Sequence, residues 1–283
     1  MANIERTVDA VNLTRGPSSG LLGYVWERGQ VIVLPVATAA LFLLAWQFAV
    51  TTFGVSDVIL PPPSEIIEEF TAHSHIILRH LVPTAMEAVL AFSIAVPFGV
   101  LLATLLTMFK FARQALYPNV ILFQIIPKIA VAPLFIIWLG IGTPSRVTFA
   151  VFISFFPVLI STATGLRSVG PELIKLCQSV GASKWKILWK VGFPTALPFI
   201  FNGMKITITM SVIGIVVGEF IAAQRGLGFL ILFASSHQQT DLCLAAVGLL
   251  CVLGLTLYGL VACAELLMQR IFGDGAPIRE TLT

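Results

Sequence analysis

Charged residues are scarce in this sequence of 283 residues. Asp, Glu, Lys and Arg make up 11% of it and hydrophobic residues 57%, whereas soluble domains carry about 25% charged residues. The mean hydropathy is +0.96. These values exclude a soluble globular domain and indicate an integral membrane protein. The formal net charge of +3 is also too small and too scattered to indicate a nucleic-acid partner.

Sequence features of catalysis are missing as well. The chain has no phosphate-binding loop of the form G-x-x-x-x-G-K-[ST], so we do not expect it to bind ATP itself. No histidine lies in a long apolar run, and the serines there lack partners at useful spacing. We therefore predict no catalytic site, and an intramembrane enzyme is disfavoured.

Cysteines and histidines show no metal-ligand pattern. The cysteines have no metal-type spacing and three of them share one apolar run, so we expect reduced cysteines that contribute to packing. Three histidines lie close together in the sequence, but nothing fixes them on one helix face, and we expect solvated surface residues. We predict no metal site and no cofactor on this chain. The residues concerned are Cys177, Cys243, Cys251, Cys263, His73, His75 and His80.

Six apolar runs are long enough to cross a bilayer, for which about 20 residues suffice. The predicted transmembrane helices are 31–53, 84–109, 116–140, 146–166, 200–223 and 243–271. A polar arm, residues 1–30, precedes them and a tail, residues 272–283, follows. The lengths of the arm and of the first run disfavour a cleaved signal peptide. Pro127 and Pro133 predict that the helix at 116–140 is bent or broken.

The positive-inside rule orients these helices. If both termini are cytoplasmic, twelve Lys and Arg flank the cytoplasmic side and only Arg79, Arg146 and Arg225 flank the other. The sequence thus predicts an all-α integral membrane protein of about six transmembrane helices with cytoplasmic N and C termini. The cytoplasmic residues in this count are Arg6, Arg15, Arg28, Lys110, Arg113, Arg167, Lys175, Lys184, Lys186, Lys190, Arg270 and Arg279.

The connection at residues 54–82 is predicted to be external and to contain an amphipathic helix. Three consecutive prolines precede Ser64, which is a suitable N-cap residue. Apolar residues then recur at helical spacing, which predicts a helix lying along the membrane surface. The residues of this predicted apolar face are Ile66, Ile67, Phe70, Ile77 and Leu81.

The stretch from Gly170 to Pro198 is a charged segment between long apolar runs. Pro171 suits the first position of a helix, and Gly181 suits the left-handed residue that ends it. Ser183 is then expected to cap a second helix, which Gly192 and Pro194 would end. The segment is predicted to be two short helices joined by a glycine turn on the cytoplasmic side.

Several motifs carry a resemblance to a known family. Together they are similar to the permease subunits of binding-protein-dependent ABC importers, in particular to the nitrate, taurine and aliphatic-sulfonate branch, over about residues 60–270. The motifs are PPPSEI from Pro61, Ile126-Pro127 through Pro133 to Trp138-Leu139-Gly140-Ile141-Gly142, Gly181-Ala182-Ser183 with Phe193-Pro194 and Leu197-Pro198, and Gly218-Glu219-Phe220 followed by Gln224-Arg225-Gly226-Leu227-Gly228.

The resemblance implies the transmembrane domain of a type I ABC importer at residues 83–271, with its cytoplasmic coupling loop at 167–198. In that family the first helix of this loop inserts into a groove on an ATPase subunit. Lys175-Leu176-Cys177 replace the acid and two alanines of the family's "EAA" motif, whereas Pro194 aligns with the family. The implied ATPase-coupling residues are Lys175, Cys177, Gln178, Gly181, Ala182, Ser183, Lys184 and Trp185.

The resemblance also implies partners. These are a second permease subunit, most economically an identical copy, and two cytoplasmic ABC ATPases that bind ATP and Mg²⁺. A periplasmic or lipid-anchored solute-binding protein and membrane lipid complete the set, and the implied location is the bacterial inner (plasma) membrane. A secondary carrier not powered by ATP is the alternative, but the sequence shows no internal repeat.

Polar residues inside the predicted spans are candidates for the translocation pathway. We select Gln124, Lys128, Asn202 and Glu219. A cation at Lys128 suits an anionic solute such as a sulfonate or nitrate; alternatively it neutralises an acid or satisfies carbonyls freed by the break. Glu219 lies at the outer end of its span, where it is also expected to order the turn at 224–228.

Three further side chains have expected contacts. Glu265 and Arg270 lie near the cytoplasmic end of the last span, and we expect them to pair on the helix surface. Trp185 either contacts the ATPase or neighbouring helices, or lies at the lipid headgroup level. The same two alternatives apply to Trp189.

Overall fold

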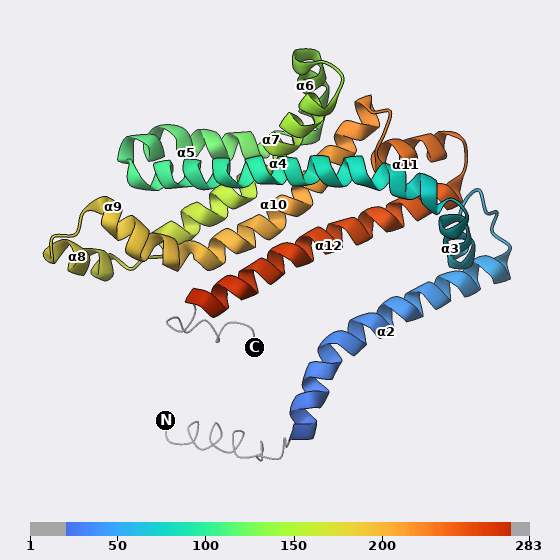
Figure 1. Cartoon of the computed structure of the whole chain (residues 1–283), viewed down its shortest axis with the longest axis horizontal. Helices are drawn as coiled ribbons and strands as arrows, with labels where there is room; N and C mark the ends of the chain where they lie inside the picture. The colour runs from blue at the N-terminus through green and yellow to red at the C-terminus, as the bar shows by residue number, and fades with distance from the viewer. Residues whose placement is uncertain (1–20, 273–283) are drawn as a thin grey trace, which may run out of the picture. The chain divides into compact units, whose positions relative to one another are not determined.

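The computed structural model describes residues 21–272, and within that range it consists of helices and their connections, with no strand. Figure 1 shows their arrangement. The predicted arm and tail, with Arg6, Arg15 and Arg279, lie largely outside the described residues. The elements are α2 (Leu21–Phe53), α3 (Pro63–Ala72), α4 (Ser74–Met108), α5 (Lys110–Ile125), η1 (Lys128–Val131), α6 (Ala132–Leu139), α7 (Thr143–Arg167), α8 (Pro171–Ser179), α9 (Lys184–Ile187), η2 (Leu188–Gly192), α10 (Phe193–Ala222), α11 (Leu227–Ser236) and α12 (Thr240–Phe272).

The chain divides into two compact units, Met1–Ser64 and Glu65–Thr283. In the first unit, α2 begins before the predicted start of the first span at residue 31. The apolar part of this helix, Val33–Phe53, is only 6% buried, so most of its side chains are exposed. The side-chain amide of Gln47 accepts from the backbone N–H of Ser64 and donates to its hydroxyl, both at 3.1 Å, which fixes the end of the following connection.

The core of the second unit is formed by α4, α7 and α10 (Figure 1). Small residues allow α7 and α10 to approach closely, as is usual between membrane helices. A Cβ added at Gly203 would lie 2.9 Å from the Cα of Val158, and one added at Gly214 would lie 2.7 Å from the Cα of Ala150. Any larger residue at either glycine would force the two helices apart.

The predicted surface helix is divided in the structure. α3 ends at Ala72, and the second part of the prediction is the beginning of α4, which passes through Pro83 without interruption into the span predicted at 84–109. The reason is packing, because most of the apolar face joins a cluster with α11 and α12. Four of the five predicted face residues belong to this cluster, and Ile67 is 65% exposed. The four are Ile66, Phe70, Ile77 and Leu81.

Among residues 21–272, five helices are long and apolar enough to cross a membrane, and a sixth span arises if one bent pair is counted as a single span. That pair is Pro118–Ile125 and Lys128–Leu139, which meet at 86°. The break falls at Pro127, so the predicted interruption of the run 116–140 is confirmed. The count agrees with the six predicted spans.

One ion pair ties α12 to the core. The ammonium group of Lys205 on α10 lies 2.5 Å from a carboxylate oxygen of Glu265 on α12, and both side chains are largely buried. The expected pairing of Glu265 with Arg270 is therefore wrong. Glu265 pairs with Lys205 on the neighbouring helix α10, and the spacing of residues along α12 alone could not predict this.

Candidate functional site

The apolar side chains of α8 are exposed. The helix starts at Gly170 and Pro171, and none of its residues is buried. Leu173 is 43% exposed and Leu176 62%, and Val180, which directly follows the helix, is 78% exposed. These exposed apolar groups on a short polar helix make α8 a candidate contact surface.

The turn after α8 has the predicted left-handed glycine. Gly181 has φ +76°, and a Cβ at this position would meet no atom within 4 Å. The backbone N–H of Ala182 donates to the carbonyl of Cys177, and that of Gly181 to the carbonyl of Gln178, both at 3.0 Å. This is the hydrogen-bond pattern of a Schellman motif, in which the helix end depends on the glycine backbone.

Ser183 caps α9 as predicted, because its hydroxyl accepts from the backbone N–H of Lys186 at 3.3 Å. The predicted end of this second helix at Gly192 and Pro194 is wrong. A π-helical turn, η2, follows α9 and leads directly into α10. Lys184–Ala222 is thus a single helical stretch of 39 residues.

The π turn explains why Pro194 does not break the helix. In a regular α-helix the proline ring collides with the carbonyl four residues earlier. Here the N–H of Phe193 donates instead to the carbonyl of Leu188, five residues back, which shifts the backbone hydrogen bonds just before the proline. The segment that begins at Lys184 is therefore continuous with the core helix α10.

The two tryptophans of this segment are exposed. Trp185 is 56% exposed and Trp189 62%. The ring of Trp189 lies 4.8 Å from that of Phe193 on the next turn. Trp185 is thus presented on the same segment as the exposed leucines of α8, where a partner or lipid headgroups can reach it.

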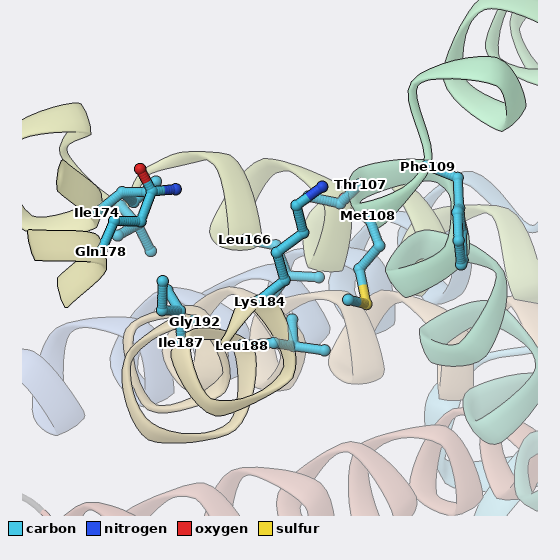
Figure 2. A pocket seen from close by; sticks show the side chains of 11 residues that line it. Thr107, Met108, Phe109, Leu166, Ile174, Gln178, Lys184, Ile187, Leu188 and Gly192 are labelled. Atoms are coloured by element: carbon cyan, nitrogen blue, oxygen red, sulfur yellow. The ribbon is translucent and has the colours of Figure 1, made fainter. Parts of the chain in front are cut away.

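A pocket of about 630 Å³ lies between this segment and the ends of α4 and α7. Figure 2 shows Ile174 and Gln178 of α8 on one side of it and Thr107 and Met108 of α4 on the other. Two predicted coupling residues, Gln178 and Lys184, line the pocket. Of the others, Lys175, Gly181, Ser183 and Trp185 are exposed, and Cys177 and Ala182 are half-buried. The remaining lining residues are Phe109, Leu166, Val169, Ile187, Leu188 and Gly192.

Lys128 lies at the break between α5 and α6. Its ammonium nitrogen is 4.4 Å from the centroid of the Phe156 ring on α7, which is a cation–π contact. No salt bridge of Lys128 occurs among residues 21–272. An aromatic face stabilises the cation without neutralising it, so the positive charge remains available to an anion.

The four predicted pathway residues are not brought together. Gln124 on α5 and Asn202 on α10 are exposed, Lys128 is half-buried, and Glu219 is 1% exposed. Within the described part of the chain no hydrogen bond or ion pair joins any two of them. The structure therefore does not form a single polar site from these residues.

Glu219 holds the turn that begins α11. One carboxylate oxygen accepts from the backbone N–H of Gly228 at 2.7 Å, and the other accepts from the hydroxyl of Thr84 at 2.8 Å. The same hydroxyl accepts from the N–H of Leu227 at 2.8 Å. Gly226 is required here because a Cβ would lie 2.0 Å from the Glu219 carboxylate. These contacts match the expectation that Glu219 orders the turn.

His80 belongs to the same arrangement, so it is not a simple solvated histidine. Its Nδ1 lies 3.1 Å from the backbone nitrogen of Gly226, and its ring stacks on Phe229 at 5.8 Å. The same His80 nitrogen lies 3.1 Å from the carbonyl oxygen of Gly226, so His80 contacts the Gly226 backbone, while Thr84 and Glu219 accept from the N–H groups of Leu227 and Gly228. His73 pairs instead with Glu69 one helical turn away.

An ion pair between Glu87 and Arg146 was missed in the sequence. The Arg146 Nε donates to one oxygen of Glu87 at 2.9 Å, and Thr143 donates to the other at 2.8 Å. Arg146 also donates to the carbonyl of Ala222 at the end of α10, at 3.3 Å. The pair could have been predicted, because the sequence places an acid just inside one span and a basic residue at the same end of another.

Comparison with known proteins places this architecture among transport proteins. Residues 95–271 match the family model described as "Binding-protein-dependent transport system inner membrane component". The riboflavin transport system permease protein RibX of Chloroflexus aurantiacus is 38% identical over 84% of this chain and 89% of its own length. The taurine transport system permease protein TauC of Escherichia coli is 31% identical over 83% and 88%.

Solved structures show the same fold. A bacterial alginate ABC transporter, crystallised with an alginate pentasaccharide-bound periplasmic protein, matches with a TM-score of 0.56. The match covers 88% of this chain and 98% of that chain at 15% identity. The MetNI methionine ABC transporter, in an inward-facing form, matches with a TM-score of 0.51 over 69% and 94% at 23% identity. The described helices therefore have the fold of an ABC transporter transmembrane domain.

Proposed function

The chain belongs to the family of binding-protein-dependent transport system inner membrane components, and we propose that it is driven by separate ATPase subunits that act on α8. It is a multi-pass membrane protein and a permease subunit of an ABC importer. The observation that carries the proposal is that the Gly181 turn joins the exposed helix α8 to one continuous helical stretch, Lys184–Ala222, which includes the core helix α10.

The chemistry of α8 supports an ATPase partner. Leu173, Leu176 and Val180 are exposed although α8 is predicted to lie on the aqueous cytoplasmic side. A groove on another protein would bury them, at roughly 25 cal/mol for each Å² of apolar surface removed from water. The sequence contains no phosphate-binding loop, so ATP and Mg²⁺ would be bound by that partner.

The route of force follows from the helix continuity. Movement of α8 reaches α9 through a turn whose hydrogen bonds depend on Gly181. From Lys184 onward the displacement passes along one helix, which packs along α7 over most of its length. Because this helix has no flexible break after Lys184, a displacement at its start also moves its far end. Closure of two ATPases would therefore shift α10 and α7 together.

The full transporter would contain two copies of this permease, two ATPases and an external solute-binding protein, in a bacterial plasma membrane. A homodimer is the simplest arrangement for one permease sequence. One solved relative was crystallised with a periplasmic protein, which supports the third component. The predicted orientation, with both termini cytoplasmic, places α8 and α9 on the ATPase side.

The solute is proposed to be a small anion. Lys128 supports this, because its charge is held on Phe156 and is not neutralised by an acid among the described residues. The names of relatives include taurine and aliphatic-sulfonate transport, but also riboflavin transport. The proposal that the solute is an anion therefore rests on Lys128 and not on the names of the relatives.

Reconstitution tests the energy source directly. The permease purified with its ATPase is placed in proteoliposomes, and uptake is measured with ATP, without ATP and with an imposed ion gradient. Uptake should require ATP and the solute-binding protein. Uptake driven by the gradient alone would identify a secondary carrier and contradict the proposal.

Leu176→Glu tests the contact surface on α8. A charge at this exposed position should release the ATPase during purification while the permease remains folded. Gln239→Glu, which adds the same negative charge at an exposed position outside α8 and α9, is the control and should retain the ATPase. Equal retention of the ATPase by wild type and Leu176→Glu would show that α8 is not the contact.

A further inference from the structure

A small basic pocket lies at the opposite end of the bundle from α8 and α9. It has a volume of about 260 Å³ and is formed by the beginning of α4 and the turn between α10 and α11. Figure 1 shows α11 and the beginning of α4 far from α8 and α9. The predicted orientation places this end on the external side. The lining residues are His75, Ile76, Arg79, His80, Gln224 and Arg225.

The two arginines of this pocket have no acidic partner among the described residues. Arg79 and Arg225 are exposed, and neither forms a salt bridge with any acid in residues 21–272. The two carboxylates that α4 and α10 carry towards this end are already bonded, Glu87 to Arg146 and Glu219 to the α11 turn. The lining also contains two imidazoles and no acid. Two guanidinium groups at a concave surface are suited to a carboxylate, which they bind by charge-assisted hydrogen bonds.

The pocket is connected to the core helices through its own lining residues. His80 contacts the backbone of Gly226, directly after Arg225, while Thr84 and Glu219 bind the next two N–H groups. Glu219 lies in the last turns of the helical stretch that begins at Lys184. An occupant that bridges Arg79 and Arg225 therefore contacts α4 and the turn between α10 and α11 at the same time.

We propose that this pocket receives an acidic side chain of the solute-binding protein when that protein docks. The inference rests on the proposed function and specifies where the external partner is bound and by what chemistry. A docked carboxylate holds α4 and the α10–α11 turn together on the outer side. Occupancy would then be transmitted along α10 to the segment that contacts the ATPase.

Charge removal tests the pocket. Arg79→Gln and Arg225→Gln are made in the permease–ATPase complex and reconstituted in nanodiscs of neutral lipid. The probe is the solute-binding protein that stimulates ATP hydrolysis by the wild-type complex. Each variant should bind it about three- to tenfold more weakly, mainly through a slower association, because exposed interface charges act on the association rate. The salt dependence of association should also become shallower.

Gln239→Glu is the matched control, because it changes the charge by the same amount at an exposed position outside the pocket. It should leave binding close to wild type. The permease variant Arg225→Glu should in turn be rescued by one Asp or Glu changed to Arg on the binding protein, found by testing its surface acids singly. Rescue by a single position would identify the carboxylate that enters the pocket.

Three results would overturn the inference. The first is wild-type affinity for the binding protein in both arginine variants. The second is reduced transport with unchanged affinity, which would assign the pocket to a free anionic solute. The third is an effect that appears only when anionic lipid is added to the nanodiscs, which would assign it to a lipid headgroup. Failure of the wild-type complex to hydrolyse ATP in response to any binding protein would instead contradict the proposed function.

Discussion

Gly181→Val should uncouple the permease from its ATPase. The glycine has φ +76°, in the left-handed region, and the site is open, so added side-chain atoms meet no neighbour. The cost is therefore that of the backbone alone, about 1–2 kcal/mol for a residue with a Cβ, and valine is at the upper end because it is β-branched. At 1.4 kcal/mol for each factor of ten, this lowers the equilibrium ratio of the native turn to other turn conformations about 5- to 30-fold.

The variant is expected to insert and to assemble with the ATPase, because α8 itself is unchanged. Substrate-stimulated ATP hydrolysis and uptake should fall severalfold, while basal hydrolysis should remain. Both are measured in nanodiscs and proteoliposomes with all partners present. Gly181→Asn should retain more activity than the valine variant, since Asn tolerates the left-handed conformation.

Gly170→Val is the matched control at the other end of α8. This glycine has φ −58° and ψ 137°, which valine adopts without strain, and its site is equally open. Its activity should be close to wild type. Normal stimulated hydrolysis in Gly181→Val, or an equal loss in both valine variants, would refute the role assigned to the left-handed turn.

Three further changes test the packing and the buried polar contacts. Removing one member of the Lys205–Glu265 pair, as in Lys205→Met, should cost about 1–3 kcal/mol, and adding Glu265→Leu should recover part of it; a double-mutant cycle of thermal unfolding without coupling would contradict this. Glu219→Leu leaves buried donors unpaired and should speed hydrogen exchange in the first turn of α11 far more than Glu219→Gln; equal exchange would show that the carboxylate does not hold the turn. Gly203→Val should lower the unfolding temperature in detergent, because its Cβ would lie 2.9 Å from a backbone atom of α7, whereas Gly259→Val, in open space, should not; similar temperatures would contradict the close packing.

Local features of the coupling segment could be predicted from the sequence. Pro171, Gly181 and Ser183 determine a helix start, a left-handed turn and a cap through their own backbone or side-chain chemistry, and all three were located correctly. The break at Pro127 was also predictable, because proline removes a backbone hydrogen bond. In each case the cause lies within a few residues of the effect.

Features that depend on neighbouring helices could not be predicted. Glycine and proline, as at Gly192 and Pro194, normally end a helix, but here a π-helical turn allows the helix to continue through both residues. The division of the predicted surface helix followed from packing against α11 and α12, which the periodicity of the segment does not contain. The partner of Glu265 likewise depended on α10 lying beside α12. An arrangement of helices is needed before such contacts can be assigned.

The central claim is that force enters at α8 and travels along one uninterrupted helix from Lys184. Its most direct test is insertion of Gly-Gly between Lys190 and Val191, within η2, which leaves α8, the Gly181 turn and α9 unchanged. The measurement is ATP-driven uptake together with ATPase retention. The complex should still assemble with its ATPase and hydrolyse ATP, but uptake should be lost. Uptake at the wild-type rate with the helix interrupted would contradict the account.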